Sequence, residues 1–377
     1  MSPFSKLSKQ LDFLAIGDTV IDAFIHLSQA EILDSLDHTE KELCITFGDK
    51  VPYDFVKVIP GVGNSANAAV SAARLGLSAG FASNIGSDDY GKDILKALKG
   101  NGVDTKQVAI NKGMESNYHY VLWYDVERTI LVKHQKYPYH FEAPAKAPKW
   151  IYLSSLGESS LAYHGEIASW LADHPEVKLV FQPGTFQMKF GVEALKNIYS
   201  RTDIFFCNVE EAKRILKWQE GAGANSQTVG GASSQTASAT SQAAGGPGGG
   251  VSSTQQTAGT RADEVKKLMK AMSGLGPKMV FITDGIDGAY AFDGTDNWFM
   301  PVYPHKPYER TGAGDAFSSA VTVALALGKS IPEALSWGPI DSMSVVQYVG
   351  AQEGLLSREK LLDFLAKAPA DYKPRKI

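Results

Sequence analysis

Residues 311–328 read TGAGDAFSSAVTVALALG, a glycine-rich turn that runs directly into a long apolar segment. Glycines just before a helix let backbone N–H groups approach an anion, and the helix N-terminus adds partial positive charge. Asp315 falls in the first turn of this expected helix. Its carboxylate could cap the helix and nothing more, or it could accept the proton of a substrate hydroxyl that attacks phosphorus. The turn alone is weak evidence for catalysis, so the rest of the chain has to distinguish a helix cap from a catalytic base.

Upstream of this turn, short apolar runs alternate with segments of helical periodicity. The expected strands are 13–16, 79–83, 150–153, 179–182, 204–207, 280–283 and 289–292, and the expected helices are 64–75, 90–99, 161–172, 192–199, 210–217 and 263–272. Three more helices, at 314–327, 331–349 and 357–367, follow in succession. The alternation predicts an α/β fold with a doubly wound, mostly parallel sheet and helices on both faces. Ligands of such sheets bind beyond the carboxyl ends of the strands.

Two regions, 23–60 and 117–136, break this alternation. Both contain β-branched and aromatic runs with a period of two, as at His119, Val121 and Trp123. They are predicted to form antiparallel strands of a smaller, appended β-sheet. The natural role of such a sheet in an α/β enzyme is a lid over the site, and the alternative is a sheet that only packs or dimerises. The large core would then comprise residues 1–22, 61–116 and 137–377.

Residues 221–260 differ sharply in composition from the rest. They are almost entirely Gly, Ala, Ser, Thr and Gln, and they contain no aromatic residue. Such a segment cannot bury enough apolar surface to offset the entropy of ordering it. We expect a disordered, low-complexity insertion in the core, either a surface loop without a role or a tail that binds a partner.

Charge and composition exclude several classes of protein. The 377 residues include 37 Lys and Arg against 41 Asp and Glu, a net charge of −4, which provides no broad field for nucleic acid or an anionic membrane. Cys44 and Cys207 lie far apart, which argues against a disulfide scaffold and a zinc ribbon. The apolar run at 320–327 is shorter than the roughly 18 residues of a membrane span, and no signal-peptide core is present at the N-terminus. We expect a cytoplasmic protein with no nucleic-acid or membrane partner.

Polar residues follow the expected strands at the places where ligands bind. Asp18 and Asp22 follow the first strand, where a carboxylate suits vicinal hydroxyls or simply caps a turn. Gly63 precedes a helix whose first turn contains Asn67; its amide can bind sugar hydroxyls or be satisfied within the helix start. Further polar turns are SNIGSDDYG at 83–91, NGVD at 101–104, NVEE at 208–211 and TDGIDG at 283–288.

These elements, in this order, resemble the ribokinase/PfkB family of carbohydrate and nucleoside kinases. The resemblance covers nearly the whole chain apart from the insertion, and its specific motifs are the glycine–asparagine helix start with VSAARLG at 70–76 and RTGAGDAF at 310–317. It implies a ribokinase-like core with a β-sheet lid. The implied activity is transfer of the γ-phosphoryl group of ATP to a hydroxymethyl group of a sugar. A nucleoside is the alternative acceptor, and a non-catalytic sugar- or nucleotide-sensing relative is the second alternative.

The resemblance also implies roles for individual residues. Asp315 would be the catalytic base, with Gly312, Ala313 and Gly314 as its anion hole. The acceptor would be bound by Asp22, Gly63 and Asn67. ATP would be bound by Thr283, Gly285, Gly288, Thr311 and Gly354, and Mg²⁺ would be held through water by Asn208 and Glu211.

Two departures from the family pattern affect these expectations. Val62 precedes Gly63 where a second glycine is usual, and Ser65 stands where a glycine is common, so the acceptor pocket could be tighter or reoriented. Glu309 and Arg310 replace the usual Asp-Thr pair, which places activation by a monovalent cation in doubt. Arg310 could bind phosphate, substitute for the cation or point to solvent.

Other residues carry weaker expectations. His119, His134 and His140 show no metal-binding spacing, and they are expected to pack on the surface or in the lid. Cys207, at the end of a strand, is expected in the core. Aromatic residues of the lid could stack on a nucleoside base, form the lid's own core or make a homodimer interface; they are Phe47, Tyr53, Tyr118, Tyr120 and Trp123.

Overall fold

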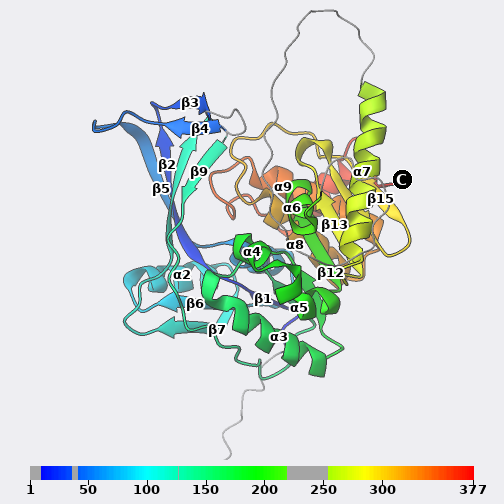
Figure 1. The fold of residues 1–377 in the computed structure, drawn as a ribbon, viewed down its shortest axis with the longest axis horizontal. Coiled ribbons are helices and arrows are strands. Elements are labelled where there is room, and N and C mark those ends of the chain that lie inside the picture. The colour runs from blue at the N-terminus through cyan, green and yellow to red at the C-terminus, as the bar shows by residue number, and fades with distance from the viewer. Residues whose placement is uncertain (1–9, 36–40, 126, 219–253) are drawn as a thin grey trace, which may run out of the picture.

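The computed structural model describes residues 10–35, 41–125, 127–218 and 254–377 (Figure 1). Its main feature is a ten-stranded sheet in the order β16-β15-β14-β13-β12-β11-β10-β1-β6-β7. The strands from β7 to β13 in this order run parallel, and β14, β15 and β16 are antiparallel additions at one edge. The strands are β1 Phe13–Ile16, β6 Ala79–Gly86, β7 Asp104–Asn111, β10 Trp150–Leu153, β11 Lys178–Phe181, β12 Ile204–Asn208, β13 Met279–Thr283, β14 Ala289–Phe292, β15 Asn297–Met300 and β16 Arg375–Lys376.

Helices cover both faces of this sheet, as predicted. Alternate residues of β1 show why: Phe13 and Ala15 belong to one buried cluster, and Leu14 and Ile16 belong to another. The first cluster includes side chains of α1, α2, α8, α9 and α10, and the second includes those of α3, α5, α6 and α7. The helices are α1 Asn64–Arg74, α2 Asp89–Gly100, α3 Leu161–Asp173, α4 Thr185–Ala194, α5 Lys196–Arg201, α6 Val209–Leu216, α7 Thr254–Ser273, α8 Ala313–Ala326, α9 Ile331–Val345 and α10 Arg358–Ala366.

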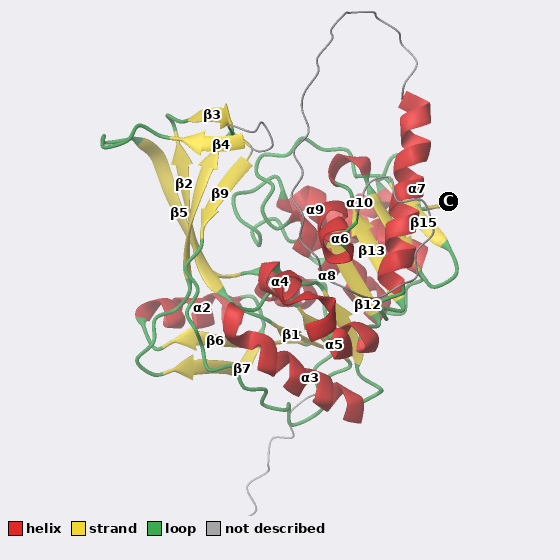
Figure 2. Cartoon of the chain, in the orientation of Figure 1, coloured by secondary structure: helices red, strands yellow, loops and turns green. Residues whose placement is uncertain are grey.

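A second sheet rises from one end of the helix-covered core (Figure 2). We call it the small sheet; it consists of β5 Tyr53–Val62, β2 Val20–Leu27, β8 Tyr118–Tyr124 and β9 Glu127–Leu131, in this order. Beyond it lies a two-stranded sheet of β3 Glu31–Asp34 and β4 Lys41–Cys44.

The small sheet differs from the expectation in two respects. It is mixed rather than antiparallel, because β2 and β8 pair in parallel while the β2–β5 and β8–β9 pairs are antiparallel. The chain passes through α1, β6, α2 and β7 of the core between β2 and β8, so it enters the small sheet twice from the same end. In addition, β2 begins at Val20, which places Asp22 in the small sheet rather than in the core segment 1–22.

The position of helix α7 shows that the low-complexity insertion is shorter than predicted. The expectation of disorder over 221–260 is wrong for its last residues, because α7 begins at Thr254. The helix buries Val265, Leu268 and Met269, and a helix anchored by packing extends readily through residues that alone could not nucleate one. Residues 219–253 lie outside the described part of the chain.

Two local differences have simple causes. One helix was expected over 192–199, but α4 and α5 meet there, with Gly191 at a φ of 81° breaking the first. Strand β7 was not expected because its sequence, DTKQVAIN, is polar at an exposed edge of the sheet. No helix in the described ranges combines the length and apolarity that a membrane span requires.

Candidate active site

A cavity of about 360 Å³, which we call the Asp315 cavity, lies between the small sheet and the carboxyl ends of the parallel strands. Most residues predicted for the site line it, namely Asp22, Gly63, Asn67, Asn208, Glu211, Thr283, Thr311, Gly312, Ala313, Gly314 and Asp315. The fold therefore brings together five motifs that are scattered along the sequence. Gly285, Gly288 and Gly354 are not part of this lining.

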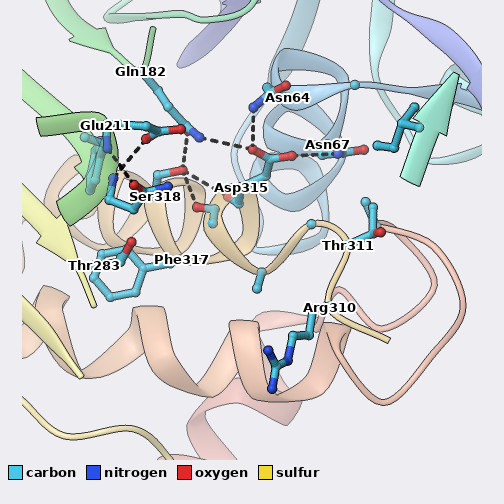
Figure 3. A pocket seen from close by; sticks show the side chains of 18 of the residues that line it. Asn64, Asn67, Gln182, Glu211, Thr283, Arg310, Thr311, Asp315, Phe317 and Ser318 are labelled. Atoms are coloured by element: carbon cyan, nitrogen blue, oxygen red, sulfur yellow. Dashed lines mark hydrogen bonds between the residues drawn. The ribbon is translucent and has the colours of Figure 1, made fainter. Parts of the chain in front are cut away.

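Asp315 is held by three side-chain amides (Figure 3). Asn64 donates from Nδ2 to Oδ1 at 3.0 Å, and Asn67 donates from Nδ2 to Oδ2 at 2.8 Å. Gln182, which follows β11, donates from Nε2 to Oδ1 at 3.2 Å. Ser318, one turn along α8, donates to Oε1 of Gln182 at 2.7 Å and thereby orients this amide. Both carboxylate oxygens are thus fixed in position before any ligand binds.

The environment of Asp315 raises its pKa above the ordinary value of an aspartate. Burial is the main cause, because it penalises the charged form. The amide donors of Asn67, Gln182 and Asn64 oppose this effect, as does the nearby positive charge of Arg128. A carboxylate of raised pKa is a stronger proton acceptor, which suits a general base.

Two glycines shape the backbone around this carboxylate. Gly312 precedes α8 with a φ of 83°, and a Cβ at this position would collide with Ala351. Gly63 precedes α1 with a φ of 117°, and a Cβ there would come within 2.8 Å of the carbonyl oxygen of Asp18. Both positions therefore require glycine, because no larger residue fits the conformation or the space.

Asn208 and Glu211 form the start of α6. Asn208 Oδ1 accepts from the backbone N–H of Glu211 at 2.8 Å, and Glu211 Oε2 accepts from that of Asn208 at 2.9 Å, a reciprocal capping box. Burial, together with the negative charge of Asp315, raises the pKa of Glu211. Thr283 lies beside Asn208 in the register of β12 and β13. The predicted metal residues therefore also have a structural role.

These oxygen ligands fit Mg²⁺, a hard cation that commonly keeps several waters and uses only one or two protein carboxylates. Within the described residues, no group of three or more His, Cys, Asp or Glu side chains is placed to hold a metal ion. The Glu211 carboxylate and the Asn208 amide would consequently act together with water and nucleotide phosphates.

The small sheet forms the side of the cavity opposite Asp315. Asp22 on β2 faces His119 on β8, with 3.4 Å between Oδ1 and Nδ1. The amide of Asn67, by contrast, is already engaged, because it donates to Asp315 and accepts from Gln352 at 3.0 Å. Asp18 lies outside the lining, and both its carboxylate oxygens accept from the hydroxyl of Tyr139, at 2.9 and 2.7 Å.

The histidines differ from one another in their surroundings. His140 lies at the surface, as predicted, where it is exposed and pairs with Glu166 at 3.1 Å. His119 instead lines the cavity, and His134 lies 3.5 Å from Asp18. Cys207 is buried, as expected, and burial raises the pKa of its thiol, so it is a poor nucleophile.

Charged contacts join the small sheet to the loops of the core. Arg310, next to the Gly312 turn, donates to Glu127 at 2.7 Å while it also lines the cavity. Lys57 on β5 pairs with Glu353, and its Nζ donates to the carbonyl oxygen of Val349 at 3.3 Å. Arg310 is therefore not simply directed to solvent, because it links the Gly312 turn to Glu127 of the small sheet.

Glu309 is hydrogen-bonded to the Gly312 turn. It is fully buried, and it accepts from the backbone N–H of Thr311 at 2.7 Å and from that of Gly350 at 3.3 Å. Arg128 of β9 lies 3.9 Å from it. Glu309, which stands where the family pattern has an aspartate, therefore contacts the Gly312 turn, the loop at Gly350 and the small sheet.

The aromatic residues of the small sheet lie away from the cavity lining. Trp123 is buried and contacts the rings of His26, Phe55 and Tyr308. Tyr118 and Tyr120 line a different hollow, together with Tyr90. The phenylalanines that line the Asp315 cavity, Phe206 and Phe317, come from the core.

Sequence reasoning missed several residues of the cavity, namely Asn64, Arg128, Gln182 and Ser318 together with the role of His119. Gln182 is the last residue of the predicted strand 179–182, so its position at a strand end was a usable signal. Arg128 lies in the region 117–136, whose pattern predicts strands but gives no signal for a residue of the site.

Comparison with known proteins agrees with this geometry. Residues 34–242 and 251–358 match the family described as pfkB family carbohydrate kinase, and the chain belongs to this family. Ribokinase of Bacillus subtilis (strain 168) is 27% identical over 320 residues, which cover 85% of this chain and 92% of that protein. 5-dehydro-2-deoxygluconokinase of Bacillus velezensis is 23% identical over 373 residues, 95% of each protein.

Solved structures show the same fold. Arabidopsis thaliana ribokinase, complexed with ribose and ATP, superposes with a TM-score of 0.69 at 17% identity, over 95% of this chain and 99% of that one. A nucleoside kinase of Methanocaldococcus jannaschii reaches a TM-score of 0.68 at 14% identity, over 96% and 100%. The predicted ribokinase-like fold and the predicted family are confirmed, while likeness of fold alone does not distinguish a sugar from a nucleoside acceptor.

Proposed function

We propose that this protein is an ATP-dependent kinase that transfers the γ-phosphoryl group to a hydroxymethyl group of a sugar. The observation that carries the proposal is the buried carboxylate of Asp315, held by three amides at the N-terminus of α8. Membership of the pfkB family supports the reaction class.

In this mechanism Asp315 accepts the proton of the acceptor hydroxyl as its oxygen attacks phosphorus. The backbone N–H groups of Gly312, Ala313 and Gly314, at the positive end of α8, stabilise the charge that develops on the transferred group. Mg²⁺, held through water by Asn208 and Glu211, would neutralise phosphate charge. Thr283, Gly285, Gly288, Thr311 and Gly354 are proposed to bind ATP.

A sugar is favoured over a nucleoside as the acceptor. The side of the cavity formed by the small sheet, which we assign to the acceptor, offers Asp22 and His119, which are hydrogen-bonding groups suited to hydroxyls. The aromatic residues that could stack on a base pack elsewhere. The cavity cations Arg128 and Arg310 both have acidic neighbours, which favours an acceptor without a charge of its own.

The small sheet is proposed to act as a lid, because it supplies Asp22, His119 and Arg128 to the cavity and contacts the core through ion pairs. Its outer face, with exposed Val58 and Tyr120, is a candidate homodimer interface. Glu309 already accepts several hydrogen bonds from protein groups, so we propose that activity does not require a monovalent cation. A cytoplasmic location and the absence of nucleic-acid and membrane partners remain predictions of composition.

The decisive experiment measures ATP turnover with Mg²⁺ against a panel of sugars and nucleosides. We expect one or more sugars to be phosphorylated and Asp315→Asn to abolish this activity. Phosphorylation of nucleosides alone would support the alternative acceptor. Binding of ATP and sugar without turnover would support the sensor hypothesis and contradict the proposal.

A further inference from the structure

Three buried side-chain atoms that line the Asp315 cavity lack a hydrogen-bond partner among the described residues. They are Oδ1 of Asp22, Nε2 of His119 and Nε of Arg128, and all three belong to the small sheet. Buried polar atoms of native proteins nearly always have partners. The carboxylate oxygens of Asp315, on the opposite side, are both engaged by amides. Unused hydrogen-bonding capacity is therefore concentrated on the acceptor side.

The positions of Asp22 and His119 are linked by strand pairing. The two residues are direct partners in the parallel register of β2 and β8, so their side chains project from the same face of the small sheet. Their 3.4 Å separation orients the Nδ1 edge of His119 toward Asp22. The ring centroid of His134 lies 5.0 Å from that of His119, with the two rings tilted. Nε2 of His119 is the ring atom left without a partner.

The chemistry of this pair suits a hydroxyl group. A carboxylate only accepts hydrogen bonds, whereas a neutral imidazole donates from one nitrogen and accepts at the other. A sugar hydroxyl does both, so neighbouring hydroxyls can satisfy Oδ1 of Asp22 and Nε2 of His119 together. A phosphate or carboxylate of the acceptor would instead be repelled by Asp22.

We propose that His119 is a specificity-determining residue whose Nε2 binds a sugar hydroxyl other than the one that is phosphorylated. The reacting hydroxyl belongs at Asp315, on the core side. The inference rests on the proposed sugar kinase activity and extends it, because it assigns recognition of the remote hydroxyls to a histidine of the small sheet.

The test compares three substitutions of His119 in the full-length enzyme. Gln places an amide near the position of Nε2, Asn places one near Nδ1, and Ala removes both. Steady-state kinetics would use the best acceptor among D-ribose, D-fructose and D-glucose, together with its singly deoxygenated analogues. His140→Gln is the matched control, since this exposed histidine lies away from the cavity and pairs with Glu166 at the surface.

We expect His119→Ala and His119→Asn to raise the acceptor KM about 5- to 100-fold, the cost of leaving one partner of a buried hydrogen bond unsatisfied. His119→Gln should stay within a few-fold of wild type. The ATP KM should not change in any variant. One deoxy analogue should bind the wild type and His119→Ala equally poorly, because the missing hydroxyl has already abolished the interaction and the substitution removes nothing more.

Two results would overturn the inference alone. One is an unchanged acceptor KM in a folded His119→Ala enzyme. The other is Asn retaining affinity where Gln loses it, which would mean that the ring only supports Asp22. A wild-type enzyme that phosphorylates none of the sugars would overturn the proposed function first, and the inference with it. Thermal unfolding of each variant identifies any loss of folding.

Discussion

The two sides of the Asp315 cavity are built differently. On the core side, Asp315 has amide partners on both oxygens and sits beside a turn that only glycine can form. On the small-sheet side, Asp22 and His119 retain unpartnered atoms. In the proposed function, the core side holds the chemical groups in position, and the acceptor completes the hydrogen bonding of the small sheet.

Removing the carboxylate of Asp315 should have the largest effect. Asp315→Ala is expected to lower kcat about 10²- to 10⁴-fold, since a positioned general base is lost. ATP affinity, measured by titration of the nucleotide, should change little. Near-normal turnover would mean that Asp315 only caps α8 and that the core side is not the chemical side.

The raised pKa of Asp315 predicts that turnover depends on pH. Asp315 must be deprotonated to accept a proton, and burial raises its pKa. Turnover should therefore be lost as the pH falls through a value above about 3.9, the ordinary aspartate pKa. The pH profile of kcat measures this, and an acid limb at or below the ordinary value would contradict the burial argument.

Removing Asp22 should affect only the acceptor. Asp22→Ala is expected to raise the acceptor KM by about 10- to 100-fold, on the scale of a hydrogen bond to a charged group, with the ATP KM unchanged. Asp54→Ala is the control, because Asp54 is a half-exposed carboxylate of the same sheet that pairs with His26. Equal weakening of both ligands would erase the distinction between the two sides.

The ion pair between Arg310 and Glu127 tests how the two sides communicate. Both side chains are about half exposed, so breaking the pair should change the acceptor KM only a few-fold. The change should shrink between about 0.05 M and about 0.5 M NaCl, because salt screens exposed charges. If Arg310 binds phosphate instead, Arg310→Ala will raise the ATP KM and Glu127→Ala will not.

Asp341 tests the stability of the core beneath the site. Burial raises its pKa to about 7, although the N–H of Leu356 and the hydroxyl of Ser71 oppose this shift. The folded state therefore favours the protonated form, so this residue's contribution to stability declines as the pH rises from about 4 to about 7. Asp341→Asn should raise Tm by a few degrees at about pH 8 and have little effect at about pH 4. An equal change in Tm at both pH values would contradict the raised pKa of Asp341.

Deleting residues 221–250 should have the smallest effect. Loop-closure entropy changes by only about 0.6 kcal/mol per doubling of loop length, so Tm and both KM values should stay close to wild type. A second deletion that also removes the start of α7 at Thr254 is the contrasting variant, and it should lower Tm more than the first deletion does because it shortens this helix. A large loss of ATP affinity in the first variant would show that the insertion has a role.

Much of the core could be predicted because its signals are local. The apolar run at Phe13–Ile16 and the glycine turn before Asp315 each specify their structure within a few residues. Such segments are buried on both faces or start a helix, and neighbouring residues suffice to encode either state. That Asp315, Gly63 and Thr283 share one site was implied by the resemblance of their motifs to the ribokinase/PfkB family rather than by local signals.

Only the tertiary structure decided which side chains meet. Asn64 and Gln182 reach Asp315 from 251 and 133 residues away, and nothing near them in the chain indicates a shared partner. His119 faces Asp22 because β8 re-enters the small sheet parallel to β2 after passing through the core. Local sequence determines whether a segment becomes a strand, but its neighbour and direction depend on where the rest of the chain brings it back, since pairing energy comes from contacts between distant segments.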